Sequence, residues 1–222
     1  YRYSDKAKIW KPERQIIVKL RQLVALRKRL LNAKSALKVP LFEVADFQDK
    51  KLQKEMEKLN KKPIDALKKQ ILEVEKRINE LIKKDECLSH LYSLVTSVEG
   101  VGKVVFWEMV ITTNEFKLFN CPRKFACYSG VVPFEHSSGI SIRGGTRVSH
   151  VAKKKKKKLL HMAALSVVSK KSELADYYHR KVEQGKNKMS VINAVRNKII
   201  HRVFACVRED RKYEKNYIPG LV

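Results

Sequence analysis

The sequence lacks the features that would place it in a membrane or in a disulfide-stabilised fold. No apolar run approaches the roughly 18–20 residues needed to cross a bilayer, and no signal peptide is recognisable. The four cysteines, Cys87, Cys121, Cys127 and Cys206, include no CxxC pair, so we expect reduced, partly buried thiols in a cytoplasmic protein. A zinc site built from Cys121, Cys127 and a histidine is the alternative, although their spacing does not match the common zinc frameworks.

Signatures of a self-contained active site are also scarce. The sequence contains no HExxH motif, no Walker loop and no thiol nucleophile with an ordered base. The acids of the central segment, Glu99, Glu108, Glu115 and Glu135, are isolated from one another. A two-metal nuclease needs several carboxylates gathered around its ions, so we predict no metal site on this chain.

Positive charge is what the sequence has in excess. Lys and Arg total 49 against 23 acids, a formal net charge of +26. Residues 1–90 carry a net charge of +11, residues 91–140 are neutral, and residues 141–222 carry +15. Because such a charge repels itself in a compact state, the distribution favours a polyanionic partner, DNA or RNA, over a merely solvated basic surface.

Residues 1–90 are predicted to form a helical hairpin or a coiled coil. Leucines at three- and four-residue spacing predict a helix over residues 11–35, and the segment 39–47 is interpreted as a connector. A second helix over 49–60 should break near Pro63, before a third over 64–84. That third helix carries an a/d-like apolar pattern at Leu67, Ile71, Val74, Ile78 and Leu81. It indicates either a dimerising or DNA-spanning coiled-coil stalk or an ordinary antiparallel hairpin.

Residues 91–222 are predicted to form a compact helical domain, so the expected fold class is all-α. The stretch with Gly100, Gly102 and Lys103 before an apolar helix over 104–111 is typical of a helix-hairpin-helix turn, whose glycines and helix amides can approach a phosphate. A short helix should end at Gly130, and a polar loop should follow over 135–150. A final helix has its core face at Ile192, Val195, Ile199, Ile200, Val203 and Phe204.

The polar loop and the lysine run after it supply further candidate phosphate contacts. A lysine run is usually a solvated face, but this one leads into an apolar helix, which favours an ordered helix start. The predicted contacts are Arg143, Arg147, Lys153, Lys154, Lys156 and Lys157. Within the loop, Ser137 and Ser138 could attack a phosphodiester if cations stabilise the developing charge. From composition alone, a loop of this kind more often binds a phosphate or forms a turn.

The order of several short motifs resembles one family of enzymes over nearly the whole chain. The motifs are Ser97–Gly102, Phe116, Phe125–Pro133, Ser138–Gly139, Arg143–Gly144, Arg147–Ser149, Leu159–Ala164 and Gly185–Lys186. Together they resemble the bridge-RNA-guided DEDD transposases of bacterial insertion sequences, known as the one-ten family. The run of six lysines, Lys153–Lys158, departs from the more mixed sequence that is usual there. Residues 1–90 would correspond to the linking coiled coil, and residues 91–222 to the C-terminal transposase domain.

The resemblance implies a chemistry for the serines. It makes Ser138 the DNA nucleophile, with Ser137 as the second candidate, and it implies a structured guide RNA and a homo-oligomer formed through the coiled coil. It also implies an N-terminal RuvC-like domain whose four acids bind Mg²⁺. These acids would lie upstream of Tyr1, so we expect this chain alone to bind nucleic acid without cutting it. The alternative is a non-catalytic, architectural nucleic-acid-binding module.

Overall fold

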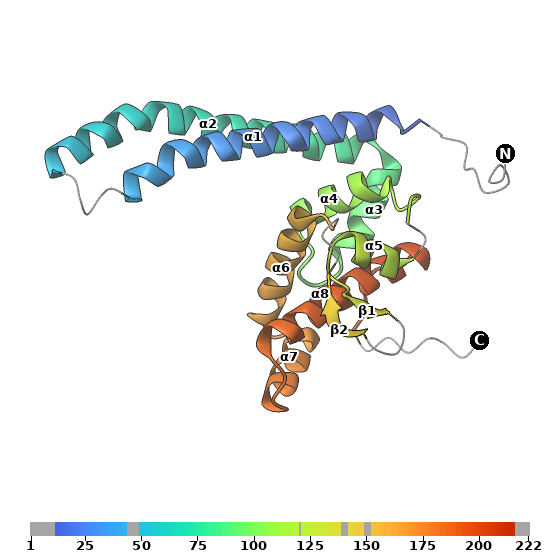
Figure 1. Cartoon of the computed structure of the whole chain (residues 1–222). Coiled ribbons are helices and arrows are strands. Elements are labelled where there is room, and N and C mark those ends of the chain that lie inside the picture. Colours follow the sequence, from blue (N-terminus) through green and yellow to red (C-terminus); the bar gives the residue numbers. More distant parts are fainter. Residues whose placement is uncertain (1–11, 44–48, 120, 139–141, 149–151, 216–222) are drawn as a thin grey trace. The chain divides into compact units, whose positions relative to one another are not determined.

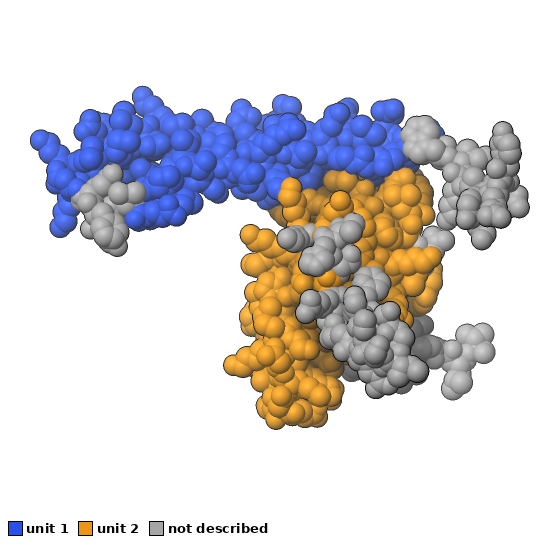
Figure 2. Space-filling model, in the orientation of Figure 1, with its two compact units in different colours: residues 1–85 blue, residues 86–222 orange. Residues whose placement is uncertain are grey.

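The chain divides into two compact units in a computed structural model that describes residues 12–43, 49–119, 121–138, 142–148 and 152–215. The first unit spans Tyr1–Asp85 and the second Glu86–Val222. Figure 1 labels the helices and strands, and Figure 2 colours the two units.

The first unit is a pair of long helices, α1 (Gln15–Glu43) and α2 (Lys50–Lys84), that run side by side (Figure 1). Their seam buries Ile17 and Leu20 of α1. From α2 it buries Ile64, Ile71, Val74, Ile78 and Ile82. Arg27 Nε donates to Glu75 Oε1 at 2.7 Å across the seam, and Arg14 pairs with Asp85 near its end. The prediction of paired helices in this region is confirmed; dimerisation through a coiled coil stays a prediction.

Two breaks predicted in this unit from proline are wrong. Helix α1 continues through Pro40 to Glu43, where a connector was expected from residue 39, and α2 is continuous through Pro63. A proline inside a helix removes one backbone hydrogen bond and costs about 3 kcal/mol. Pro63 is exposed, and Ile64 beside it is buried with Ile71 in the seam. Burial of this apolar face therefore outweighs the local penalty.

The second unit packs its helices around α8 (Lys188–Arg208), which contacts α3 (Glu86–Thr96), α5 (Pro122–Tyr128), α6 (Lys154–Val168) and α7 (Glu173–Glu183). Helix α4 (Lys103–Thr113) packs against α3 and α6. All six residues predicted for the core face of the last helix are buried in α8. Helices α3 and α7 were not predicted. The α3 signal was available, because its buried residues Leu88, Leu91, Leu94 and Val95 follow a helical period.

The segment predicted as a polar loop contains an antiparallel hairpin of β1 (Phe134–Ser138) and β2 (Ile142–Arg147) (Figure 1). The loop prediction is therefore wrong for these residues. Apart from this hairpin the described chain is helical, and the expectation of a mainly helical fold is confirmed. No helix in the described ranges is both long enough and apolar enough to span a membrane.

Tyr213 and Lys215, in the described part after α8, contact the turn between α3 and α4. The amide of Tyr213 donates to Ser97 Oγ at 2.8 Å, and Lys215 pairs with Glu99 at 3.0 Å. The Tyr213 hydroxyl donates to Glu173 Oε2 at 2.8 Å. Burial, reinforced by this bond to a carboxylate, raises the pKa of Tyr213 to about 12. Tyr213 and Lys215 are thus held against the helical core.

Candidate nucleic-acid interface

The turn between α3 and α4 uses its first glycine for packing. Gly100 has φ +82°, a conformation that L side chains rarely adopt. A Cβ atom added there would lie 2.2 Å from Val167 Cγ2 and 2.8 Å from the carbonyl oxygen of Ala163, both on α6. Gly100 therefore lets the turn approach the backbone of α6. Its predicted role at a phosphate stays a prediction. The contact with α6 is a separate structural reason for a glycine at this position.

The second glycine of the turn faces open space. Gly102 is the N-cap of α4, with φ −92° and no side-chain cap, and nothing lies within 4 Å of a Cβ added to it. The first amides of a helix have no intrahelical partner and attract anions. Lys103 is exposed beside them, its ammonium 5.9 Å from the centre of the Trp107 ring. Gly102 and Lys103 thus have the accessibility that a phosphate contact requires.

The lysine run begins α6 as predicted, but its members differ in environment. Lys153 is the N-cap residue, and its amide donates to the carbonyl of Tyr128 at 3.1 Å. Lys156 forms an ion pair with Glu108 of α4. The exposed side chains of the run are Lys153, Lys155 and Lys158, while Lys156 and Lys157 are half-buried, and the side chain of Lys154 lies outside the described part. The sequence did not single out Lys155 and Lys158.

The predicted nucleophile and two predicted arginine contacts lie in one hairpin. Ser138 is the last residue of β1 and pairs with Ile142, and Ser137 pairs with Arg143. Arg147 pairs with Phe134 at the other end, and the register shifts between Phe134 and His136. Gly139–Ser141 lie outside the described residues. The backbone register therefore brings Ser137 and Arg143 to adjacent positions, with Ser138 next along the strand.

A partly buried polar network holds the stem of this hairpin. The Asn193 side-chain amide donates to the carbonyl of Val131 at 2.6 Å, three residues before β1. Arg196 Nη1 donates to Asn193 Oδ1 at 3.1 Å, and Arg196 Nη2 lies 2.6 Å from His161 Nδ1. Val131 is fully buried and Arg196 is 4% exposed. The network therefore ties α6, α8 and the start of the hairpin together inside the core.

The network fixes the protonation state of His161. A guanidinium only donates, so His161 Nδ1 must accept, and the ring carries its proton on Nε2. Burial lowers the pKa of His161, and the charge of Arg196 lowers it further. Burial also lowers the pKa of Arg196. The sequence analysis gave none of these three residues a role. An arginine one position after Val195 on an otherwise apolar helix face was the available signal.

Several described carboxylates of the second unit already contact basic side chains from other positions. The pairs are Glu99–Lys215, Glu108–Lys156, Glu115–Lys117, Glu173–Arg202, Glu209–Arg211 and Asp210–His90. A two-metal site needs carboxylates that face a shared ion. All four cysteines are free, as expected. Neither Cys121 nor Cys127 belongs to a group of metal ligands within the described ranges.

Comparisons with known proteins find a transposase family model and relatives named for gene inversion or for an insertion element. Residues 92–179 match the family model described as "Transposase IS116/IS110/IS902 family". A "Pilin gene-inverting protein" of Moraxella bovis is 27% identical over 65% of this chain and 45% of that protein. Its counterpart in Moraxella lacunata is 26% identical over the same shares. The "Insertion element IS110 uncharacterized 43.6 kDa protein" of Streptomyces coelicolor is 24% identical over 70% of this chain and 37% of that protein.

The segment that matches the IS116/IS110/IS902 transposase family, residues 92–179, lies within the second unit. The resemblance predicted from the ordered motifs is thereby confirmed at the level of the family. The match spans less than half the length of each of these curated relatives.

Proposed function

We propose that this chain supplies the nucleophilic serine of a DNA strand-exchange enzyme and that Ser138 is this serine. The main support is the family match, together with relatives named for gene inversion and for an insertion element. The hairpin register adds to it, because Ser138 ends β1 beside the Ser137–Arg143 pair. Ser137 is the second candidate for the same role.

The proposed step is a phosphoryl transfer. The Ser138 oxygen forms a bond to a backbone phosphorus while the bond from that phosphorus to the 3′ oxygen breaks. The serine loses its proton and the leaving oxygen gains one, which gives a phosphoserine link and a free 3′ hydroxyl. Arg143 and Arg147, both in β2, would stabilise the negative charge that develops on the phosphate. A second strand would then attack the phosphoserine and restore the serine.

Nucleic-acid binding is the other half of the proposal. The charge of +26 favours DNA and a structured guide RNA as partners, with affinity that falls steeply as salt rises. Gly102 and Lys103 at the start of α4, with the exposed lysines at the start of α6, would contact phosphates. The first unit would join two copies of the chain through its helices.

Magnesium chemistry is assigned to residues outside this chain. The resemblance implies a RuvC-like domain with four metal-binding acids, and the paired carboxylates of the second unit do not fit that role. The prediction remains that the 222-residue chain binds DNA or RNA and cuts neither with magnesium present.

The nucleophile is tested by comparing Ser138→Ala with Ser137→Ala in a strand-exchange assay with the complete transposase. We expect Ser138→Ala to abolish both exchange and the covalent protein–DNA adduct while DNA affinity stays within about twofold. Ser137→Ala should retain the adduct. Loss of exchange with Ser137→Ala alone would move the nucleophile to Ser137. Wild-type exchange with both variants would favour the architectural, non-catalytic module.

A further inference from the structure

A groove on the second unit is not used by the proposed phosphoryl transfer. It has a volume of about 570 Å³, within the range of about 300–1,000 Å³ that is common for ligand sites. Its lining includes Phe116, Phe119 and Pro122 from the α4–α5 segment. From α8 it includes His201, Arg202, Phe204 and Arg208. The groove therefore combines aromatic rings from one segment with cations from the central helix.

The aromatic lining belongs to a connected cluster of rings. The centres of the Phe116 and Phe204 rings lie 5.2 Å apart, with an interplanar angle of 82°. Phe119 meets Phe125 at 5.5 Å and 84°, and Phe125 lies 5.6 Å from Phe204. Such edge-to-face contacts fix ring orientation. Phe125 is buried, whereas Phe116 and Phe119 are half-buried, so the outer two rings keep surface for a ligand.

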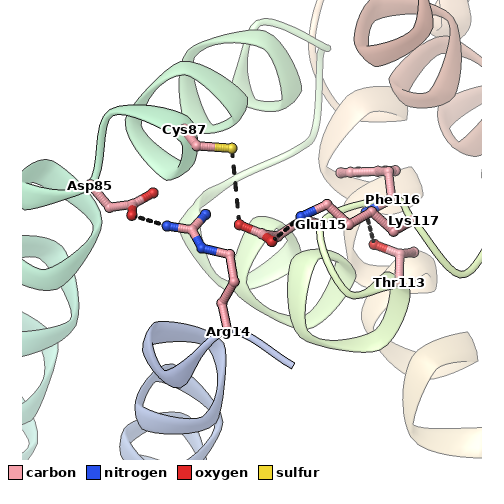
Figure 3. A network of polar contacts seen from close by, with 7 residues as sticks. All are labelled: Arg14, Asp85, Cys87, Thr113, Glu115, Phe116 and Lys117. Carbon is pink, nitrogen blue, oxygen red and sulfur yellow. Dashed lines mark hydrogen bonds and ion pairs between the residues drawn. The ribbon is translucent and has the colours of Figure 1, made fainter. Parts of the chain in front are cut away.

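The backbone that presents Phe116 has an unusual conformation. Asn114, Glu115 and Phe116 have φ values of 46°, 58° and 63°, in the left-handed region that non-glycine residues seldom adopt. The Phe116 amide donates to Thr113 Oγ1 at 2.9 Å. Glu115 is buried and pairs with Lys117 at 2.7 Å (Figure 3). Strained backbone of this kind persists where its surroundings hold it in place, and it is common at binding sites.

The rim of the groove carries positive charge. None of its described lining residues is acidic. Arg202 is held by Glu173 at 2.9 Å and lies over the ring of Tyr213, at 4.7 Å from its centre. Arg208 is 74% exposed and pairs with Glu209 at 3.0 Å, and a pair so exposed to water is weak. Arg208 can therefore exchange this partner for an anion of the ligand.

We propose that this groove holds an unpaired nucleobase of single-stranded DNA or RNA. The base stacks against Phe119 and Phe116, and its flanking phosphate meets Arg208 and His201. Aromatic platforms bordered by cations are the usual means of binding single strands. A basic peptide is disfavoured because no described lining residue is acidic, and a purely apolar side chain would leave the cationic rim without a partner. The inference rests on the proposed nucleic-acid binding and adds a contact that a fully paired duplex cannot make.

The test measures binding of the full 222-residue chain to three fluorescent probes. These are a single-stranded DNA 12-mer, the same sequence as RNA, and a fully paired DNA hairpin. Phe119→Leu removes the ring and keeps much of its volume, Phe119→Tyr keeps the ring, and Leu118→Ala, at a neighbouring exposed position, is the control. Arg208→Gln is compared with Lys212→Gln, which removes the same charge from a residue outside the groove lining.

We expect Phe119→Leu to weaken single-strand binding by about 5- to 150-fold and to change hairpin binding by less than twofold. Phe119→Tyr and Leu118→Ala should bind like the wild type, and Arg208→Gln should weaken single-strand binding more than Lys212→Gln. The comparison of the DNA and RNA probes decides which strand the groove prefers.

Equal losses on single strand and hairpin, or no loss with Phe119→Leu, would overturn the groove assignment. A Phe119→Leu chain that instead loses self-association in sedimentation would assign the groove to a second copy. Absence of wild-type binding to all three probes would refute the proposed function itself. Circular dichroism of each variant shows whether the fold is retained. If Phe119→Leu misfolds, Arg208→Gln and quenching of a 2-aminopurine base in the single strand decide the question.

Discussion

Gly100→Ala tests the contact between the α3–α4 turn and α6. Two separate costs arise. A φ of +82° costs a residue with a Cβ about 1–2 kcal/mol. The new Cβ would also lie 2.2 Å from Val167 Cγ2 and 2.8 Å from the Ala163 carbonyl oxygen, and overpacking of this kind costs about 1–3 kcal/mol. We therefore expect Gly100→Ala to lower the free energy of unfolding by about 2–5 kcal/mol. This is a large part of the total of about 5–15 kcal/mol that is usual for folded proteins.

The matched control is Gly102→Ala, two residues along the same turn. Gly102 has φ −92°, which alanine adopts, and its added Cβ meets nothing within 4 Å. Alanine is a poorer N-cap than glycine, so we expect Gly102→Ala to lower the free energy of unfolding by less than about 1 kcal/mol. Because Gly102 stands at the open start of α4, this variant should instead weaken nucleic-acid binding.

The assay is urea unfolding followed by tryptophan fluorescence. The chain has two tryptophans, and Trp107 is fully buried in α4. A Trp10→Phe background leaves Trp107 as the only tryptophan, so fluorescence excited selectively at tryptophan reports on the second unit alone. The midpoint and slope of the transition give the change in the free energy of unfolding.

A loss below about 0.5 kcal/mol for Gly100→Ala would refute the packing argument. If that variant also bound DNA much more weakly at unchanged stability, the original prediction of a phosphate-approaching glycine would be favoured. Equal losses of stability for Gly100→Ala and Gly102→Ala would show that the turn responds to helix capping, with no specific contact to α6.

Two further predictions concern the buried network and the first unit. Because the pKa of His161 is lowered in the folded state, the unfolded chain binds its proton more readily. Neutral His161 therefore contributes fully to the free energy of unfolding above about pH 6.5. This contribution is lost as the pH falls from there toward the pKa of His161 in the folded state. His161→Asn keeps an acceptor for Arg196 and should make the urea midpoint depend less on pH between pH 7.5 and 5.5. A variant with the same pH dependence as the wild type would contradict this account. In the first unit, Ile78→Ala should cost about 2–5 kcal/mol because Ile78 is fully buried, while Leu72→Ala, 67% exposed, should change stability by less than about 0.5 kcal/mol. Similar values for the two variants by thermal unfolding would contradict the observed seam.

Periodicity predicted the helices that bury one regular face. The six core positions of α8 and three of the seam positions of α2 follow directly from apolar spacing. Proline misled the prediction at Pro40 and Pro63, because the local penalty is smaller than the burial of the surrounding helix. The hairpin was missed because a polar strand gives little alternation of hydrophobicity, and its pairing depends on register between separated residues.

The residues of the candidate site also fall into two groups, those that local motifs predicted and those that are brought together only by packing. Ordered motifs led to Ser138 and to the arginines of β2, since they are short and local in sequence. The pairing of Lys156 with Glu108, and the network of His161, Asn193 and Arg196, join residues far apart in the chain. Composition does not encode such contacts. They require the packing of α4, α6 and α8, which only the three-dimensional structure provides.

Helix α8 carries both the tether of the hairpin stem and one wall of the aromatic groove. Asn193 holds the stem, and Arg208 stands at the far end of the groove wall. A helix rises about 1.5 Å per residue, so about 22 Å of rigid rod separates the two positions. The helix therefore fixes the distance between the hairpin stem and any nucleotide held in the groove. One residue inserted between them would turn one end by about 100° relative to the other and separate the two functions without removing a side chain from either.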